Sequence, residues 1–393
     1  MKNRNREFSV VYNNNSIHKR DKLFSPLGVI VFFIAMIIAI SGSLAATLLV
    51  LLGLLAVIII GEKRGYIEKA YELVQRDRKS TTIVFIISFI LLPFVLKGNS
   101  YHLHILIMAG IYAIVALGLN FQIGSMGLVN FAPAAMFGAG AYTSAVLTVK
   151  FGMSAWIGLI GAVILTALLG IVFGFPALKT RGFYFSLVTI ALQTIFTLMI
   201  VNIDWLGGPD GIPGIAPFTL FGHSLKQHMS VFGTRLPYQI NYIFLTYILL
   251  FLLVIISRRL YLSRYGLAWN AIEVDEIVAS TQGIDLTKLK LLSFSIGSVF
   301  AGIAGSIYAH YTSFIGAEDF DFNRSLILIC MVLLGGKDNP IGVVLGAVLL
   351  TVIDENLRVF ADYRMLMYAI ILIVVLIVRS QGLLPKRNRK YPV

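Results

Sequence analysis

The hydrophobic pattern of this chain consists of long uncharged apolar runs separated by short segments rich in Lys and Arg. A run of about 20 apolar residues can cross a bilayer as a helix, and about twice that length can cross twice. The pattern predicts an all-α polytopic membrane protein, with about ten core transmembrane helices and a leading hairpin, about twelve crossings in all. The predicted core spans are 81–96, two within 105–149, then 154–173, 183–203, 238–256, 291–311, 326–334, 341–352 and 366–378.

The N-terminal region divides into a basic tail (1–22), an uncharged stretch (23–61) and a second basic segment (62–80). The start of the uncharged stretch resembles a signal peptide, but the apolar run resumes at once, so an uncleaved transmembrane hairpin is expected. Basic residues favour the cytoplasmic side. We therefore expect the tail, the loop 62–80 and the C-terminal tail 381–393 to be cytoplasmic, with the main transmembrane domain at 81–380. By the same parity, segments 312–324 and 354–364 lie outside.

Composition narrows the class further. The 393 residues are 58% hydrophobic and only 13% charged, with a net charge of +13. Because the cationic residues stand between apolar runs, they are typical of membrane topology and argue against nucleic-acid binding. The single cysteine, Cys330, lies in an apolar run, which excludes an intramolecular disulfide and a thiolate metal site.

Two predicted spans contain breaks rich in glycine and side-chain amides, around 118–133 and 335–340. Such groups are costly at membrane depth unless they line a cavity or allow helices to pack closely. Interrupted helices point to a transport pathway, whereas close packing is the simpler explanation for Gly138 and Gly140. The candidate pathway residues are Asn120, Gln122, Gly124, Ser125, Asn130, Gly335 and Gly336.

A polar segment at 258–290 interrupts the apolar sequence between two spans. Its residues 267–282 have helical periodicity, with an apolar stripe at Leu267, Ala271, Val274 and Val278. Gly283 stands where a helix C-cap favours a left-handed residue. At about 24 Å this helix is too short and too charged to span a bilayer. It either covers its own membrane domain or docks a soluble subunit that drives the membrane part.

The other long polar segment, 204–237, is expected on the external side, where its Gly-Gly-Pro-Asp-Gly turn sequence either docks a partner or connects two spans. No predicted span carries Asp, Glu, Lys or Arg near its centre, which disfavours ion-coupled transport. Gly336-Lys337 is followed by Asp338, so there is no phosphate-binding loop of the Walker type. His102 and His104 lack zinc-site spacing. The chain is therefore expected to have no catalytic, cofactor or metal site, and energy is expected to enter from another subunit.

Several motifs together resemble the permeases of high-affinity branched-chain amino acid ABC importers, the LivM type, from about residue 101 to the C-terminus. The resemblance rests on Gly118-Leu119-Asn120, 124–127 (Gly-Ser-Met-Gly), 139–143 (Ala-Gly-Ala-Tyr-Thr), 181–184 (Arg-Gly-Phe-Tyr), 207–211 (Gly-Gly-Pro-Asp-Gly), 263–266 (Ser-Arg-Tyr-Gly), 271–276 (Ala-Ile-Glu-Val-Asp-Glu), 302–309 (Gly-Ile-Ala-Gly-Ser-Ile-Tyr-Ala) and 334–336 (Leu-Gly-Gly).

This resemblance implies a subunit of the bacterial-type inner membrane, with a ten-helix core like those of cobalamin and ribose importers. Its expected partners are a second, homologous permease, two cytoplasmic ABC ATPases that bind ATP and Mg²⁺, and an extracytoplasmic substrate-binding protein. The segment 264–283 would be the helix that couples to an ATPase. The implied coupling residues are Arg264, Gly266, Ala271, Glu273, Asp275, Glu276 and Gly283.

Three other functions remain open at this stage. Urea permeases share much of this pattern, so an importer of urea or short-chain amides is an alternative. An ion-coupled secondary carrier or channel would make 267–282 only a loop. A membrane-embedded enzyme is disfavoured because no acid, base or metal ligands cluster in the sequence.

Overall fold

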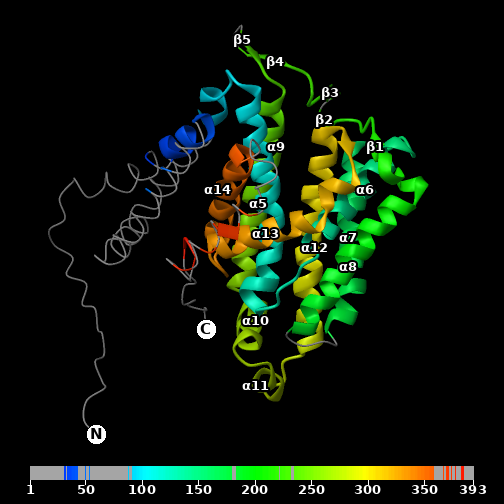
Figure 1. The fold of residues 1–393 in the computed structure, drawn as a ribbon, viewed down its shortest axis with the longest axis vertical. Coiled ribbons are helices and arrows are strands. Elements are labelled where there is room, and N and C mark those ends of the chain that lie inside the picture. Colours follow the sequence, from blue (N-terminus) through cyan, green and yellow to red (C-terminus); the bar gives the residue numbers. More distant parts are fainter. Residues whose placement is uncertain are drawn as a thin grey trace, which may run out of the picture.

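The computed structural model describes residues 33–42, 91–178, 183–220, 222–231 and 234–357, together with scattered positions on either side. The predicted N-terminal tail, the basic loop 62–80, and most of the hairpin and of the C-terminal tail lie outside the described residues. The described part is mainly helical, with its long helices running roughly side by side (Figure 1). Six of the described helices are long and apolar enough to cross a membrane.

Two long helices form the centre of this bundle. Helix α5 (Ser100–Met126) and helix α12 (Leu286–Thr312) have 27 residues each. At 1.5 Å per residue each is about 40 Å long. Asn99 caps the start of α5, and Gly127, in the left-handed conformation with φ 67°, ends it. In the most apolar 18-residue window of α5, 83% of residues are buried, so α5 is a core helix surrounded by protein.

Four further helices surround this centre. The helices α7 (Ala155–Leu178), α8 (Phe183–Asn202) and α9 (Gln239–Tyr261) leave much of their apolar surface exposed, as expected for faces that meet lipid. Helix α6 (Pro133–Val149) packs between α5, α7 and α12. It approaches α12 closely: a Cβ on Gly140 would lie 2.4 Å from the Gly302 Cα. Close packing of α6 against α12 therefore explains the glycine at position 140.

The second glycine-rich break separates two helices, α13 (Phe322–Gly335) and α14 (Pro340–Leu357). Helix α13 has 14 residues, about 21 Å, and is too short to span a bilayer. It lies across the bundle between α12 and α14 (Figure 1). The predicted separate crossing at 326–334 is therefore wrong, because this helix is too short to cross and begins beside the middle of α5.

The first break is shorter than the sequence suggested. Asn120 to Ser125 belong to the regular helix α5, which continues to Met126, and only 127–132 form the interruption before α6. The predicted break at 120–130 is therefore wrong for 120–126 and correct for 127–130. The polar side chains of α5 are tolerated at this depth because other buried side chains bind them, as described below.

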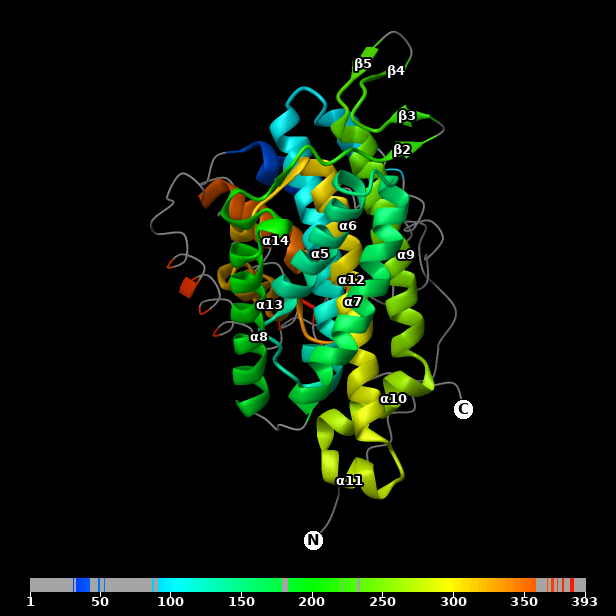
Figure 2. The ribbon, with the colours of Figure 1, turned by 90° about the vertical axis from the view of Figure 1, so that its right-hand side faces the viewer.

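The two polar segments lie at opposite ends of the bundle, as Figure 2 shows. At one end the segment 204–237 contains two 3₁₀ turns, η1 (Asp204–Leu206) and η2 (Gly208–Asp210), and the short strands β1 (Ile212–Pro213), β2 (Thr219–Leu220), β3 (His223–Ser224), β4 (Met229–Val231) and β5 (Thr234–Leu236). At the other end lie α10 (Arg264–Val274) and α11 (Glu276–Thr281).

The segment 204–237 is fastened to the end of α12. Strand β1 pairs antiparallel with β6 (Phe314–Ile315), with Ile212 opposite Ile315. Strands β2 and β3 form one two-stranded ladder, and β4 and β5 form another. The Ser313 hydroxyl donates to the Ile215 carbonyl at 2.9 Å, and Lys226 Nζ donates to the Ser313 hydroxyl at 2.6 Å. A third 3₁₀ turn, η3 (Ala317–Phe320), then leads into α13.

Candidate coupling surface and polar sites at membrane depth

The predicted coupling helix is two helices. Helix α10 ends at Val274 and α11 begins at Glu276, so one continuous helix over 267–282 is wrong. Asp275 causes the break: its backbone is extended (φ −159°, ψ 111°), and its carboxylate accepts hydrogen bonds from the backbone N–H of Ile277 (2.8 Å) and Val278 (3.1 Å). An Asp at an N-cap position is a recognisable start signal, and it could have been read from the sequence.

The tip of this helix pair presents bare apolar side chains to solvent. Val274 is 85% exposed, Ile277 66%, Val278 56% and Leu267 50%. The residues buried against the protein are instead Gly266, Trp269, Ile272 and Ala279. Most of the predicted apolar stripe therefore does not cover its own membrane domain, and only Ala271 packs partly against it. Ile277 is a member of the exposed surface that periodicity did not identify.

The predicted coupling residues shape and fasten this tip more than they form its surface. Gly266 is buried where a Cβ would lie 2.2 Å from the Tyr261 carbonyl oxygen. Gly283 has φ 80° and follows the end of α11, as predicted. Glu276 accepts from Lys290 Nζ at 2.6 Å, which joins α11 to α12. Arg264 begins α10 and is exposed, and Glu273 lies beside Gly127.

Buried aromatic rings connect α10 to the central helix. Trp269 is fully buried, and its indole N–H donates to the Leu289 carbonyl at 3.0 Å. The Phe121 ring of α5 lies 5.7 Å from Trp269 and stacks on Tyr261 at 4.9 Å. Asp285 caps the start of α12, and hydrogen bonds from Lys288 hold the pKa of the Asp285 carboxyl below its usual value. Helix α10 is thus in direct contact with both α5 and α12.

Three predicted pathway residues bind the loop between α13 and α14 instead of facing open space. The Asn120 side chain donates to the Tyr261 hydroxyl at 2.7 Å and accepts from the Asp338 backbone N–H at 2.9 Å. The Ser125 hydroxyl donates to the Asp338 carboxylate at 2.7 Å. Gly124 leaves room for this loop, since a Cβ there would lie 2.4 Å from the Asp338 nitrogen. Asp338, which the sequence did not single out, is the centre of this network.

The remaining pathway candidates also contact other residues of the chain. Asn130 donates to the Gln122 side-chain carbonyl at 2.7 Å and accepts from the Ala132 N–H at 2.8 Å. A small cavity lies beside Gln122 and Asn130, with apolar walls from α5, α6 and α12. Gly335 is the last residue of α13 and Gly336 follows it, and a Cβ on Gly335 would lie 2.3 Å from the Gly342 carbonyl oxygen. Gly335 therefore allows α13 and α14 to meet closely.

Helix α6 begins inside the bundle, where side chains of other helices accept hydrogen bonds from its first backbone N–H groups. The Ala134 N–H donates to the Ser325 hydroxyl at 3.1 Å, and the Ala135 N–H donates to the Gln193 side-chain oxygen at 2.8 Å. Gln193 in turn donates to the Phe320 carbonyl at 2.7 Å. Because unpaired backbone groups are costly at membrane depth, these contacts explain how an interrupted helix is stable here.

Charged groups are present at membrane depth, contrary to the expectation from sequence. The Arg324 guanidinium carbon lies 5.2 Å from the centre of the Tyr112 ring, and Tyr112 is the thirteenth of the 27 residues of α5. Arg324 Nη1 is 3.8 Å from the Asp354 carboxylate, and the Asp354 side chain is 6% exposed. The prediction that Arg324 and Asp354 lie in external loops is wrong, because the short helix α13 begins beside the middle of α5. Among the described residues, no cluster of His, Cys, Asp and Glu could hold a metal ion.

Comparison with known proteins agrees with this architecture. The family described as "Branched-chain amino acid transport system / permease component" matches residues 101–376. The chain is 36% identical to the high-affinity branched-chain amino acid transport system permease protein LivM of Salmonella typhimurium, over 75% of this chain and 72% of that protein. It is 34% identical to LivM of Escherichia coli over the same shares.

A second type of relative is more distant. The permease protein LivH of Escherichia coli is 24% identical over 70% of this chain and 91% of its own length. No solved structure matches the chain significantly. The family match covers most of the chain and includes both glycine-rich breaks and the α10–α11 tip. The chain therefore belongs to the permease component family of branched-chain amino acid transport systems and is a multi-pass membrane permease subunit of the ABC importer type.

Proposed function

We propose that this chain forms half of the translocation pathway of an ATP-driven importer of branched-chain amino acids. Its proposed partners are a second permease of the LivH type, two cytoplasmic ABC ATPases that bind ATP and Mg²⁺, and an extracytoplasmic binding protein. The chain itself holds no cofactor in this proposal. It is placed in a bacterial-type inner membrane, with both termini cytoplasmic and the β-strand end external. The relatives' names support the cargo, and the presence of LivM and LivH relatives supports the pairing.

The observation that carries the coupling part of this proposal is the exposed apolar tip of α10 and α11. Val274, Ile277 and Val278 are each more than half exposed on a polar segment that lies beyond the membrane-crossing helices. Burial of one such side chain stabilises an interface by about 1.5–3 kcal/mol. A contiguous apolar surface at the end of a membrane protein fits a cleft in a soluble partner.

The interior contacts suggest how a push on this tip reaches the membrane helices. Displacement of α10 acts on α5 through the rings of Trp269 and Phe121, and displacement of α11 acts on α12 through the pair of Glu276 and Lys290. Asn120 then links α5 to the loop between α13 and α14. Closely packed glycine contacts, such as that of Gly140 with Gly302, permit helices to rotate as rigid units. Alternating access follows from such movement.

The direct test of this proposal is uptake by proteoliposomes that contain both permeases, both ATPases and the binding protein. We expect ATP-dependent uptake of labelled leucine, isoleucine and valine, and no comparable uptake of labelled urea. Uptake of urea in place of leucine would assign the cargo to the urea and amide importers. Leucine uptake driven by a proton or sodium gradient without ATP would assign the chain to the secondary carriers, which also use ionisable groups at membrane depth.

A further inference from the structure

The Arg324 side chain has unused hydrogen-bonding capacity. A guanidinium carries five N–H donors in a planar fork that matches a carboxylate. In the part of the chain that the structure describes, its only carboxylate neighbour within ion-pair distance is Asp354, at 3.8 Å, and no side-chain acceptor lies within hydrogen-bond distance. The side chain is 22% exposed and lies over the Tyr112 ring. A cation at this depth without hydrogen-bonded partners indicates a functional site.

A second polar group nearby lacks a partner. Tyr142 of α6 is only 4% exposed, and among the described residues its hydroxyl has no hydrogen-bond partner. A buried hydroxyl without a partner is unusual and costs about 1–3 kcal/mol. Its ring packs against Phe320, with ring centres 5.8 Å apart, and its hydroxyl is close enough to feel the charge of Asp319. The Tyr142 hydroxyl is therefore a buried donor that no described group satisfies.

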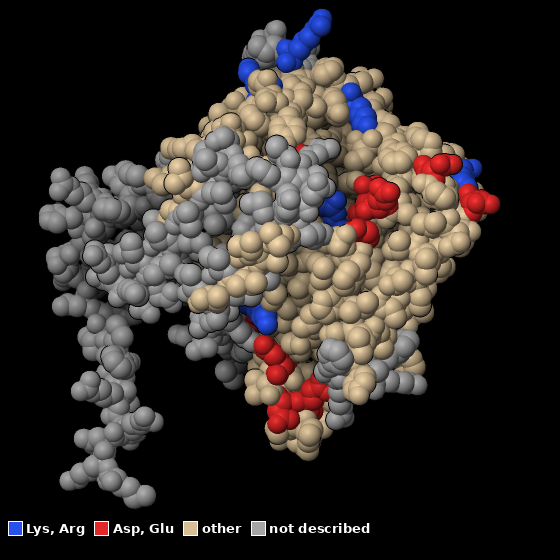
Figure 3. Space-filling model, in the orientation of Figure 1, with Lys and Arg blue, Asp and Glu red and all other residues tan. Residues whose placement is uncertain are grey.

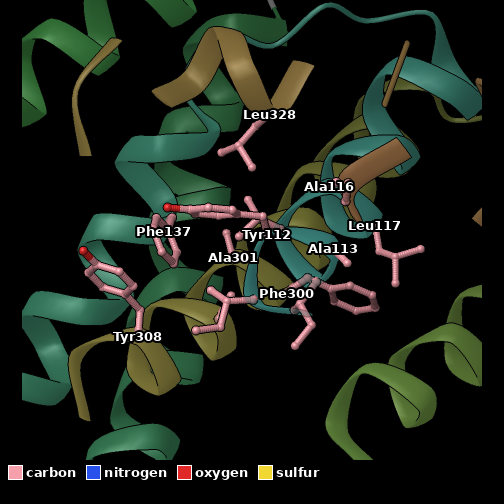
Figure 4. Packing of buried hydrophobic residues seen from close by; sticks show 14 of the residues in the cluster. Tyr112, Ala113, Ala116, Leu117, Phe137, Phe300, Ala301, Tyr308 and Leu328 are labelled. Carbon is pink, nitrogen blue, oxygen red and sulfur yellow. The ribbon is translucent and has the colours of Figure 1, made fainter. Parts of the chain in front are cut away.

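Aromatic rings join these two groups into one wall. The Phe320 ring contacts Tyr142, Phe137 and Tyr308, and Phe137 in turn contacts Tyr112 beneath Arg324. Figure 4 shows the rings of Tyr112, Phe137 and Tyr308 together, with the two tyrosine hydroxyls directed to the same side. These rings are themselves buried, with Phe320 0% and Phe137 1% exposed, so they form the apolar packing beside the charged groups.

Carboxylates complete the group of charges. Asp319 and Asp321 are partly exposed and flank Phe320 at the turn that leads into α13. Asp319 accepts from the Gly316 N–H at 3.0 Å, and Asp321 accepts from the Arg324 backbone N–H at 2.8 Å. Figure 3 shows acidic and basic side chains lying together beside a hollow on this face. A cation, carboxylates and an apolar wall are therefore close to one another.

We propose that this cluster is a transient binding site for an α-amino acid zwitterion on the transport path. The Arg324 guanidinium binds the α-carboxylate, Asp319 binds the ammonium group, and the Tyr142 hydroxyl donates to the carboxylate. This inference rests on the proposed function and extends it, because it gives the membrane subunit its own selectivity against cargo without a carboxylate.

The site can be tested without transport, by equilibrium binding of labelled leucine to the purified permease–ATPase complex lacking the binding protein. We expect saturable binding that leucinamide, which lacks the carboxylate, displaces at least about tenfold less well than leucine, as expected for loss of a charge-assisted hydrogen bond. Arg324→Gln should weaken leucine binding by about tenfold or more, and Arg324→Lys should restore part of it. Lys97→Gln is the matched control, because Lys97 is exposed and distant in sequence from the cluster.

Tyr142→Phe keeps the proposal falsifiable if Arg324→Gln fails to fold. Because the hydroxyl has no partner in the described structure, its removal should leave the melting temperature unchanged or raise it, while leucine binding weakens about fivefold. Unchanged leucine binding in both variants, or equal competition by leucine and leucinamide, would overturn the site. If the wild-type complex takes up leucine with ATP but shows neither effect, only this inference fails. Absence of ATP-driven leucine uptake would instead contradict the proposed function.

Discussion

Lys290 of α12 and Glu276 of α11 form an ion pair of 2.6 Å, in which the lysine side chain is only 6% exposed. The pair holds the small helix α11, which has six residues, against the long helix α12. Isolated helices of this length are unstable in water. The position of α11 therefore depends on this contact and on the Asp275 cap.

Replacement of Lys290 by Met tests that dependence. Methionine fills the buried volume, but Glu276 loses its partner, which costs about 1–3 kcal/mol. We expect α11 to become protease-sensitive and leucine uptake per ATP hydrolysed to fall several-fold. Lys288→Met is the control: Lys288 is 85% exposed, and its pair with Asp285 is a solvent-screened surface contact that contributes little to stability. Equal behaviour of the two variants would show that the buried pair does not position α11.

The exposed tip is tested by Ile277→Asp. Ile277 is 66% exposed, so the substitution leaves the fold of the isolated subunit unchanged and places a charge in the proposed interface. Loss of about 1.5–3 kcal/mol of burial should weaken binding of the ATPases by about tenfold or more. The measurement is the affinity of purified ATPase for the permease pair in nanodiscs. Ser280→Asp, at an exposed polar position of the same helix, is the control, and equal affinity for both variants would refute the tip as the docking surface.

The close approach of α6 and α12 predicts a stability difference between two Gly→Ala substitutions. A Cβ on Gly140 meets the Gly302 backbone at 2.4 Å, whereas a Cβ on Gly98 has nothing within 4 Å. Overpacking costs about 1–3 kcal/mol, and more where backbone must move. We expect Gly140→Ala to lower the melting temperature of the detergent-purified protein by several degrees, and Gly98→Ala to leave it unchanged. Equal melting temperatures would mean that the two helices can separate freely.

The network around Asn120 predicts a combined loss of stability and coupling. In Asn120→Ala the Tyr261 hydroxyl loses its donor and the Asp338 N–H loses its acceptor, each costing about 1–3 kcal/mol. We expect a lower melting temperature and a lower ratio of uptake to ATP hydrolysis. Asn202→Ala is the control, because Asn202 is exposed and bonds only within its own helix. A lower melting temperature with a normal ratio of uptake to ATP hydrolysis would mean that the network only stabilises the fold.

Much of the membrane topology could be predicted from the sequence, because the lengths of apolar runs fix helices that cross a bilayer. The helices α7, α8, α9 and α12 lie close to the predicted spans. The same reasoning failed for α13, since a helix of 14 residues inside a bundle has the same composition as part of a span. The number of crossings over the whole chain stays a prediction.

The sites were harder to predict, because their side chains meet only in three dimensions. Asn120 and Ser125 were identified as unusual polar residues, but their partner Asp338 lies 218 positions from Asn120. Arg324 and Asp354 were placed outside the membrane because polar residues precede or follow them. Only the fold shows that α13 begins beside the middle of α5. By contrast, the capping pattern at Asp275 is local in sequence. It would have allowed the boundary between α10 and α11 to be predicted from the sequence alone.

The central claim is that energy reaches this permease only through ATPases docked on α10 and α11. Its most direct test is uphill uptake of labelled leucine into proteoliposomes, measured for the complete complex with ATP, for the complex with a non-hydrolysable ATP analogue, and for the permease pair alone with an imposed ion gradient. We predict accumulation above the external concentration only in the first case, and its loss when Ile277→Asp is introduced. Accumulation by the permease pair alone would contradict the account.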